Sequence, residues 1–181
     1  MIATNRLYLR SFREQDWQAV HAYSVDPEVV RYVSAESPSE EETREIIRSW
    51  MRGQADCPPH YDFAVTVRPD EFVIGWCCIQ ISSGNKQVGE LMYVFNRNFW
   101  RRGYATEAAQ GVVSYGFSKL KLHRIFATCR PENIGSWHVL EKLGMRREGL
   151  LRENVWIRGN WCDSYLYAIL GYEWESRVGI S

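Results

Sequence analysis

The sequence has no excess charge of either sign and no long apolar run. Lys plus Arg and Asp plus Glu both number 22 in 181 residues. A chain with zero net charge produces no global field that attracts nucleic acid or a membrane surface. The longest near-continuous apolar stretch, Val73 to Ile81, is much shorter than the roughly 20 residues of a transmembrane helix. We therefore expect no direct nucleic-acid partner, no membrane partner, and only a local anion site.

The five cysteines form no C-x-x-C pair, and no histidine lies at metal-ligand spacing from them. We therefore expect neither a disulfide framework nor a metal site. Cys77 and Cys78 adjoin in an apolar run and would point to opposite faces of a strand, which is typical of small buried residues in a reducing compartment. Since no N-terminal stretch resembles a signal peptide, we expect a cytoplasmic protein.

Two phosphate-binding signatures are also missing, because the chain has no G-x-x-x-x-G-K-[ST] and no G-x-G-x-x-G. There is no repeat or low-complexity tract, and Pro58-Pro59 is the only stiff break. The hydrophobic fraction of 45% and charged fraction of 24% are those of an ordinary globular protein. Residues 1–181 are therefore predicted to form a single domain.

The first fifty residues are predicted to be mainly helical. A short strand at Leu7 to Arg10 precedes a helix over Arg13 to Tyr23. Ser39 and Glu42 have the spacing of a capping box, which predicts a second helix as far as Met51. The period then changes to β, and an antiparallel meander is predicted over Tyr61 to Val67, Phe72 to Ile81 and Lys86 to Phe95.

The centre of the chain alternates strand and helix. Apolar residues between Gly103 and Leu120 follow the i, i+3, i+4 spacing of a helix, and His123 to Cys129 is predicted to be a strand. Asn133 to Leu143 is predicted to be another helix, and the remainder two strands around a turn at Gly159-Asn160. A strand, crossover helix and strand of this length usually form a right-handed parallel pair, which makes the sheet mixed.

A local anion site is indicated where the third meander strand leads into the long helix. Arg97, Arg101 and Arg102 lie within six residues, directly before Gly103. Unpaired N–H groups and the helix dipole make a helix N-terminus favourable for phosphate. From spacing alone, a solvated loop with Gly103 as a simple entry residue accounts for the pattern equally well.

The chain resembles the GCN5-related N-acetyltransferases, and among them the RimJ/RimL-like branch. The resemblance covers almost all of the chain. The matching segments are Thr4–Arg10, Gly89–Val94, Phe99–Ala108, Arg130–Ser136, Glu141–Met145 and Gly159–Asp163. It implies an α+β fold: a mixed, mostly antiparallel sheet of about seven strands, with helices on both faces and a central βαβ unit.

The resemblance also implies acetyl-CoA as co-substrate and an amine as acceptor. The loop amides that would wrap the pyrophosphate are those of Arg101, Arg102, Gly103, Tyr104, Ala105 and Thr106. Tyr93, Val94 and Phe95 would pair with the pantetheine arm as an added strand, and Asn133 would contact the same arm. The family loop usually begins with Gln or Arg, whereas this chain has Trp100 there.

Acetyl transfer to an amine needs a base for the amine and a proton for the leaving thiolate. Glu90 is the candidate base, because strand alternation places it on an apolar face, which raises the pKa of a carboxyl group. The alternative is a glutamate that reaches water or an arginine. Ser136 shares a helix face with Leu140 and Leu143, so its hydroxyl should point toward the sheet. The resemblance places it near the thioester sulfur, which makes it the candidate proton donor. Ser136 as a simple first-turn residue, or Tyr104 or Tyr165 as donor, remain open.

The acceptor is not determined by the sequence. The resemblance favours a protein or peptide N-terminus of the ribosomal-protein type. Alternatives are an antibiotic, polyamine or other small amine, and a protein that binds acyl-CoA without turnover. The acidic stretch formed by Glu36, Glu40, Glu41 and Glu42 is typical of a solvated helix start, or else attracts a cationic amine. The aromatic-rich final strands are compatible with a homodimer.

Overall fold

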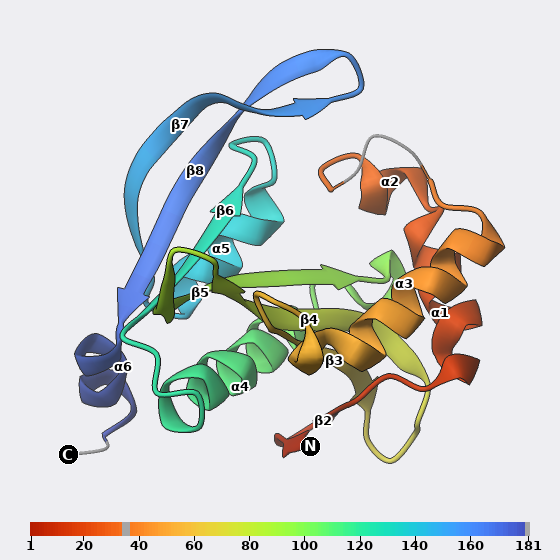
Figure 1. Cartoon of the computed structure of the whole chain (residues 1–181), viewed down its shortest axis with the longest axis horizontal. Coiled ribbons are helices and arrows are strands. Elements are labelled where there is room, and N and C mark those ends of the chain that lie inside the picture. Colours follow the sequence, from red (N-terminus) through yellow and green to blue (C-terminus); the bar gives the residue numbers. More distant parts are fainter. Residues whose placement is uncertain (34–36, 180–181) are drawn as a thin grey trace.

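A computed structural model describes residues 1–33 and 37–179. Its centre is an eight-stranded sheet in the order β1-β2-β3-β4-β5-β6-β8-β7 (Figure 1). Only β5 and β6 are parallel neighbours; the other pairs are antiparallel. The strands are β1 (Ile2–Ala3), β2 (Leu7–Arg10), β3 (His60–Val67), β4 (Val73–Ser82), β5 (Asn85–Phe95), β6 (Arg124–Cys129), β7 (Arg146–Ile157) and β8 (Asn160–Leu170).

This architecture confirms the predicted mixed α+β sheet with a central βαβ unit. The strand beyond the predicted seven is β1, whose two residues pair with β2 at the start of the chain. The crossover between the parallel strands β5 and β6 is the long helix α4 (Tyr104–Ser118). The carboxyl end of β5 therefore leads directly into the N-terminus of that helix, where open α/β sheets bind their ligands.

Helices cover both faces of the sheet, and each face has its own hydrophobic core. On one face α1 (Trp17–Ser24), α2 (Pro27–Val30) and α3 (Glu40–Arg52) enclose a smaller core that includes Val20 and Ile47. On the other face α4, α5 (Ile134–Lys142) and α6 (Gly171–Val178) enclose a larger one.

Two of these helices are not predicted by the sequence pattern. Helix α2 is only four residues long, with Asp26 as N-cap and Pro27 at its first position, so it has no periodicity to detect. The prediction that only two strands follow Leu143 is wrong, because helix α6 comes after the second of them. This helix buries a single large residue, Trp174, so its apolar face is too narrow to show a helical period.

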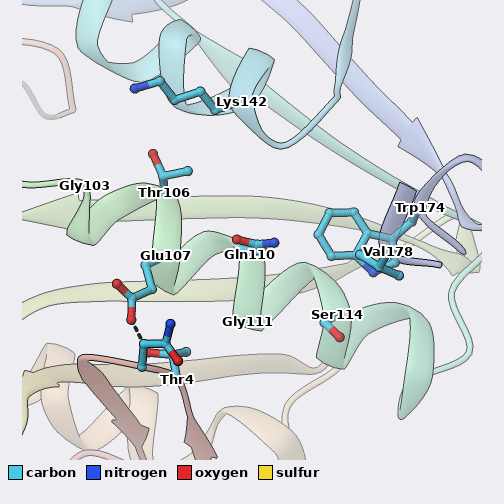
Figure 2. Close-up of a pocket in the computed structure, with 11 residues that line it drawn as sticks. Thr4, Gly103, Thr106, Glu107, Gln110, Gly111, Ser114, Lys142, Trp174 and Val178 are labelled. Atoms are coloured by element: carbon cyan, nitrogen blue, oxygen red, sulfur yellow. Dashed lines mark hydrogen bonds between the residues drawn. The ribbon is translucent and has the colours of Figure 1, made fainter. Parts of the chain in front are cut away.

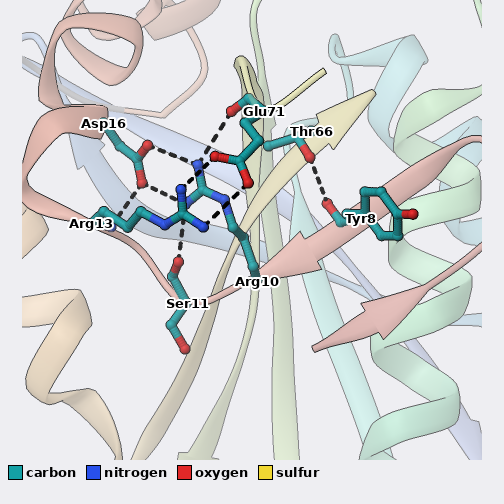
Figure 3. A network of polar contacts seen from close by, with 7 residues as sticks. All are labelled: Tyr8, Arg10, Ser11, Arg13, Asp16, Thr66 and Glu71. Atoms are coloured by element: carbon teal, nitrogen blue, oxygen red, sulfur yellow. Dashed lines mark hydrogen bonds and ion pairs between the residues drawn. The ribbon is translucent and has the colours of Figure 1, made fainter. Parts of the chain in front are cut away.

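A polar network joins the first helical layer to the edge of the sheet (Figure 3). Arg10 at the end of β2 donates two hydrogen bonds to Asp16, at 2.7 and 2.9 Å, and both side chains are largely buried. Asp16 also accepts from the backbone N–H of Arg13. The bidentate geometry fixes the start of α1 relative to β2, and with it the position of the layer over the sheet.

The final two strands form a long hairpin that rises away from the rest of the molecule (Figure 1). β7 is the outermost strand of the sheet, and most of its side chains are exposed. Across residues 1–33 and 37–179, none of the helices has the length and apolar character needed to cross a membrane.

Candidate active site

The two central parallel strands separate shortly after they meet. β5 and β6 pair at three positions, from Val88↔Arg124 to Glu90↔Phe126. Beyond Glu90, β5 continues as far as Phe95 along β4 only, while β6 continues as far as Cys129 along β8. A wedge-shaped gap therefore opens in the sheet, and it opens toward the loop that begins α4.

Backbone groups of β5 point into this gap. The Gln87 carbonyl accepts from the amide that precedes β6, and the Phe95 carbonyl accepts from Trp100 Nε1 at 2.7 Å, so both face away from β4. The register between β5 and β4 is unbroken from Gly89 to Phe95, and alternate residues of a strand bond to the same side. The N–H and C=O groups of Leu91 and Tyr93 therefore face the gap.

Glu90 lies where the strands part, on the face covered by α1 to α3. Thr128 of β6 donates a hydrogen bond to Glu90 Oε1 at 3.3 Å. Burial raises the pKa of the Glu90 carboxyl above its ordinary value, and the bond from Thr128 opposes the shift. A half-buried carboxylate with a raised pKa is suited to accept a proton from an amine near neutral pH.

The opposite face of the gap carries two hydroxyl groups in contact. Tyr93 Oη lies 3.0 Å from Ser136 Oγ and donates to the Ser136 carbonyl oxygen at 2.9 Å. Burial raises the pKa of Tyr93, although the bond to Ser136 lowers it. Burial also raises the pKa of the nearby Cys129 thiol to about 11. All three groups are therefore neutral and protonated at physiological pH.

Helix α5 places Ser136 toward the sheet, as its helical spacing predicts. Asn133 is the N-cap, and its Oδ1 accepts from the Ser136 amide at 3.2 Å. The two alternative tyrosines make other side-chain contacts: Tyr104 packs against the guanidinium of Arg6. Tyr165 lies beside Cys129 on the neighbouring strand and packs against the guanidinium of Arg147. The contact geometry thus pairs Ser136 with Tyr93, which the sequence analysis assigned only to backbone pairing.

The loop between β5 and α4 has two residues in the left-handed region. These are Arg101 with φ of 59° and Gly103 with φ of 78°. A Cβ at Gly103 would lie 3.3 Å from Arg6 Nη2, so both conformation and space favour glycine. Gly103 is the N-cap of α4 and provides no side-chain cap. The first amides of α4, from Tyr104 onward, are therefore available to an anion.

Arg6 of the N-terminal segment holds this loop in place. Its Nη1 donates to the Arg102 carbonyl at 2.9 Å, and its Nε donates to Glu107 Oε2 at 2.7 Å. Thr4 Oγ1 donates to the other Glu107 oxygen at 2.6 Å. Burial would raise the pKa of Glu107, but the bonds from Thr4 and Arg6 outweigh it and lower that pKa. Glu107 therefore remains ionised and anchors the start of α4 to the first strands.

The three arginines expected at the loop do not act together. Arg97 Nε pairs with Asp26 at 2.8 Å, so its charge is used to join the loop to the cap of α2. Arg101 and Arg102 stay exposed, and the Arg102 guanidinium lies 5.7 Å from the Phe99 ring centre. The local positive charge is therefore smaller than the sequence indicates and is concentrated at Arg101 and Arg102.

A groove of about 620 Å³ continues from this loop along α4. Figure 2 shows Thr106 and Gln110 on the helix, Lys142 at the end of α5 facing Thr106, and Trp174 of α6 farther along. Neither Gln110 nor Lys142 is among the site residues predicted from the sequence. Lys142 lies in the matching segment Glu141–Met145, but its approach to α4 depends on how the two helices pack.

A second cavity, of about 610 Å³, lies on the α1 to α3 side of the sheet. Its floor includes Trp76 and Val94, which are opposite each other in β4 and β5. Its rim includes Glu41, Glu42 and Glu45 of α3. Glu36 of the predicted acidic stretch lies outside the described residues. The cavity shares a sheet face with Glu90, because Val94 is four residues farther along the same strand.

All five cysteines are free. Within the described ranges 1–33 and 37–179, no group of three His, Cys, Asp or Glu residues is arranged to hold a metal ion.

Comparison with known proteins agrees with this geometry. A sequence profile described as "Acetyltransferase (GNAT) domain" matches residues 6–146. The chain is 39% identical over 174 residues to "Uncharacterized N-acetyltransferase YnaD" of Bacillus subtilis, which covers 96% of this chain and 99% of that protein. A GNAT-family acetyltransferase from Bacillus anthracis superposes with a TM-score of 0.87 at 38% identity, over 95% of this chain and 99% of that one.

A more distant structure shares the fold. It is the spermidine N-acetyltransferase from Vibrio cholerae, solved in complex with CoA and spermine, with a TM-score of 0.80 at 22% identity over 94% of this chain and 99% of that one. The chain belongs to the GNAT family and is an N-acetyltransferase.

Proposed function

We propose that the protein transfers the acetyl group of acetyl-CoA to the α-amino group of a protein or peptide N-terminus, as in the RimJ/RimL-like branch. One observation carries the proposal. The gap between β5 and β6 has a carboxylate with a raised pKa on one face and a pair of protonated hydroxyls on the other. Acetyl transfer to an amine uses a base for the amine and a proton donor for the departing thiolate.

The residues along the gap fit acetyl-CoA. Exposed amides at the start of α4, with Arg101 and Arg102 beside them, suit a pyrophosphate. Leu91 and Tyr93 present backbone groups to an extended chain that lies between the strands, in the manner of an added strand. The Phe95 carbonyl is already bonded to Trp100, so pairing is expected to end before Phe95. Thr106 and Lys142 in the groove beyond are candidates for the remaining phosphate.

Bound acetyl-CoA supplies the acetyl group as a thioester. Glu90 accepts a proton from the incoming amine, directly or through one water, so that the neutral nitrogen can attack. An α-amino group has a pKa near 8, so a weak base of this kind is sufficient. Ser136, in contact with Tyr93, donates the proton that the departing sulfur needs. The ammonium loses two protons in all, one to Glu90 before attack and one from the nitrogen after the C–N bond forms. As the C–S bond breaks, one of these protons replaces the one that Ser136 gives to sulfur, and the other passes to solvent.

A small amine is the second candidate acceptor. The cavity beside Val94 has a volume of about 610 Å³, which is the size of a small-molecule site. A protein N-terminus and a small amine would both present their nitrogen to Glu90. The two acceptors differ in which part of the molecule fills this cavity. A protein that binds acyl-CoA without turnover has the same gap but needs no raised pKa at Glu90.

The test has two parts. Calorimetry is expected to detect acetyl-CoA binding, and its absence at about 1 mM, the upper end of common KM values, would contradict the co-substrate. Free thiol release is then measured with N-terminal peptides and with small amines. Glu90→Gln is expected to lower turnover about 10²-fold while leaving acetyl-CoA affinity unchanged. If thiol is released with small amines but with no peptide, a small amine replaces the protein N-terminus as the proposed acceptor.

Two further properties belong to the proposal. The exposed aromatic residues of the β7–β8 hairpin, Trp156 and Trp161, are proposed to lie in a homodimer contact. Five unpaired cysteines favour a reducing compartment, so the cytoplasm is the proposed location.

A further inference from the structure

The cavity on the α1 to α3 side has an aromatic floor that is fixed in place. The indole rings of Trp50 and Trp76 stack with centroids 5.0 Å apart and an interplanar angle of 11°. Phe12 packs on the far side of Trp50 at 4.7 Å. Both tryptophans line the cavity, and neither is fully buried. The floor is therefore a rigid apolar surface on which a ligand can lie.

A buried polar pair sets the orientation of Trp76. Trp76 Nε1 donates to Asp62 Oδ1 at 2.7 Å, and the Asp62 side chain is 1% exposed. His60 pairs with the second oxygen of Asp62, and Asp56 lies 3.0 Å from the other His60 nitrogen. A buried carboxylate needs such partners. Because His60 bonds to the other oxygen, the Trp76 ring cannot turn without removing the indole hydrogen bond to Asp62 Oδ1.

The rim of the cavity is negative. Glu41, Glu42 and Glu45 line it, and among the described lining residues there is no Lys or Arg. Arg48 pairs with both Glu41 and Glu45, and Glu42 accepts hydrogen bonds from Ser39, so the three carboxylates and Arg48 together keep a net negative charge. Placement at a helix start explains Glu41 and Glu42, since acidic residues favour the first turn. Glu45 lies beyond that turn, where it forms an ion pair with Arg48 three residues along the helix.

The cavity lies at a defined reach from the proposed base. Val94 on the cavity floor and Glu90 at the gap share one face of β5, and four residues of strand span roughly 13 Å. A ligand with one nitrogen at Glu90 and its body on the tryptophans is therefore extended. A compact amine would fill one of these places and leave the other empty.

We infer that this cavity selects an extended acceptor amine that carries a second cationic group. The reacting nitrogen lies at Glu90, the apolar middle lies on Trp50 and Trp76, and the second cation faces Glu41 and Glu45. This inference rests on the proposed acetyl transfer. A linear diamine and a short peptide with a basic side chain present the same chemistry, and the two are separated by the experiment.

The experiment compares acceptors in pairs matched in length. A diamine is compared with the monoamine that lacks its second nitrogen, and a peptide with a lysine after its first residue is compared with the norleucine version. The dicationic member of a pair is expected to have a KM about tenfold lower. If only the diamine pair shows this preference, the acceptor is a small molecule. If only the peptide pair shows it, the acceptor is a peptide. Equal KM values within both pairs would overturn the inference, even if turnover proves the transfer itself.

Substitutions at the rim supply the decisive control. Glu41→Gln with Glu45→Gln is expected to remove the tenfold preference while leaving the monoamine and acetyl-CoA KM values unchanged. Glu40→Gln is the matched control, because Glu40 lies in the same first turn but does not line the cavity. A preference that survives the double substitution, or disappears in Glu40→Gln, contradicts the assignment.

Binding without turnover gives an independent measurement. Calorimetry of the diamine with the CoA-loaded protein should show weaker binding, by about tenfold, in the double variant. Failure of acetyl-CoA itself to bind is a different result and contradicts the proposed function instead. Trp50→Leu tests the floor, and it is expected to raise the KM of both members of a pair. If that variant does not fold, Trp50→Phe keeps an aromatic surface and is expected to retain the preference.

Discussion

Glu90 and Tyr93 are three residues apart on β5, and their side chains lie on opposite faces of the sheet. An odd spacing on a strand always has this result, because side chains alternate. Glu90 therefore faces the layer that contains the acceptor cavity, and Tyr93 faces α5 with Ser136. The proposed base and the proposed proton-donating pair are thereby kept apart within a short stretch of chain.

The raised pKa of Glu90 predicts the pH dependence of the reaction. The carboxylate form is the base, so kcat/KM should fall as the pH drops through the Glu90 pKa, above the ordinary carboxyl value of about 4.3. Glu90→Gln should lower the rate about 10²-fold and remove this acid limb. The measurement is kcat/KM from about pH 5 to about pH 9 for both proteins. An acid limb that persists in the variant would assign the base to another group.

The Glu90 contribution to the free energy of unfolding should change with pH in the direction opposite to kcat/KM. A folded-state pKa above the unfolded one means that the folded protein binds more protons, so the Glu90 contribution to stability falls as the pH rises between those two values. Glu90→Gln should therefore leave the free energy of unfolding at pH 7 unchanged or increase it. Glu148 is the control, because its bonds to Arg124 lower its pKa. Its contribution is present above the unfolded pKa and lost on acidification, so Glu148→Gln should destabilise slightly.

The contact between Tyr93 and Ser136 predicts a shared effect on the leaving group. Tyr93→Phe and Ser136→Ala should each lower kcat by roughly 10- to 10²-fold, with little change in the KM of acetyl-CoA. Because the two hydroxyls act as a unit, the double variant should be little worse than either single one. Tyr165→Phe is the control, since its ring packs on Arg147. A full effect in that control, with none at Tyr93, would contradict the assignment.

At the scale of elements, the start of the chain and the start of α4 form one unit. Arg6 and Glu107 are about a hundred positions apart, yet their side chains meet at 2.7 Å. The sequence marks both segments, Thr4–Arg10 and Phe99–Ala108, as matching the family. It cannot show that they meet, because no local period or cap connects them. Contacts of this kind need the tertiary structure.

Removal of Arg6 is expected to loosen the phosphate loop without touching the reaction. Arg6→Ala should raise the KM of acetyl-CoA about tenfold, roughly 1.4 kcal/mol, and change kcat by less than about twofold. Arg13→Ala is the matched control. Its side chain is 46% exposed against 48% for Arg6, and it pairs with Glu71 away from the loop. Equal effects of the two substitutions would indicate a general loss of charge, and a fall in kcat alone would place Arg6 in the chemistry.

Elements with a strong local signal are predicted well, and elements that depend on packing are not. The capping box of Ser39 and Glu42 marks the start of α3 correctly, and both of its hydrogen bonds are present. Alternation in β5 identifies the face of Glu90, and helical spacing identifies that of Ser136. The role of His60 and Asp62 has no local signal, because it depends on Trp76, which lies fourteen residues beyond Asp62 on the neighbouring strand.

At the scale of the whole molecule, zero net charge conceals a separation of charges across the sheet. Exposed Arg101 and Arg102 lie at the mouth of the gap, and the carboxylates of α3 lie at the cavity on the other layer. The sequence predicts both regions but overstates the first, since Arg97 is bound to Asp26. That pair joins the two regions, so the loop for an anion and the helices around the acceptor are fixed relative to each other.

The outermost hairpin gives the last prediction. β7 is an edge strand, and Trp156 and Trp161 pack against each other at 5.3 Å with more than half of each side chain exposed. An unpaired edge beside exposed aromatic residues favours association. We therefore expect a homodimer in light scattering, and Trp156→Glu with Trp161→Glu should shift it to monomer. Tyr172→Glu is the control, because that residue is equally exposed on α6. A monomeric parent protein, or a dimer that survives the double substitution, would exclude the hairpin contact.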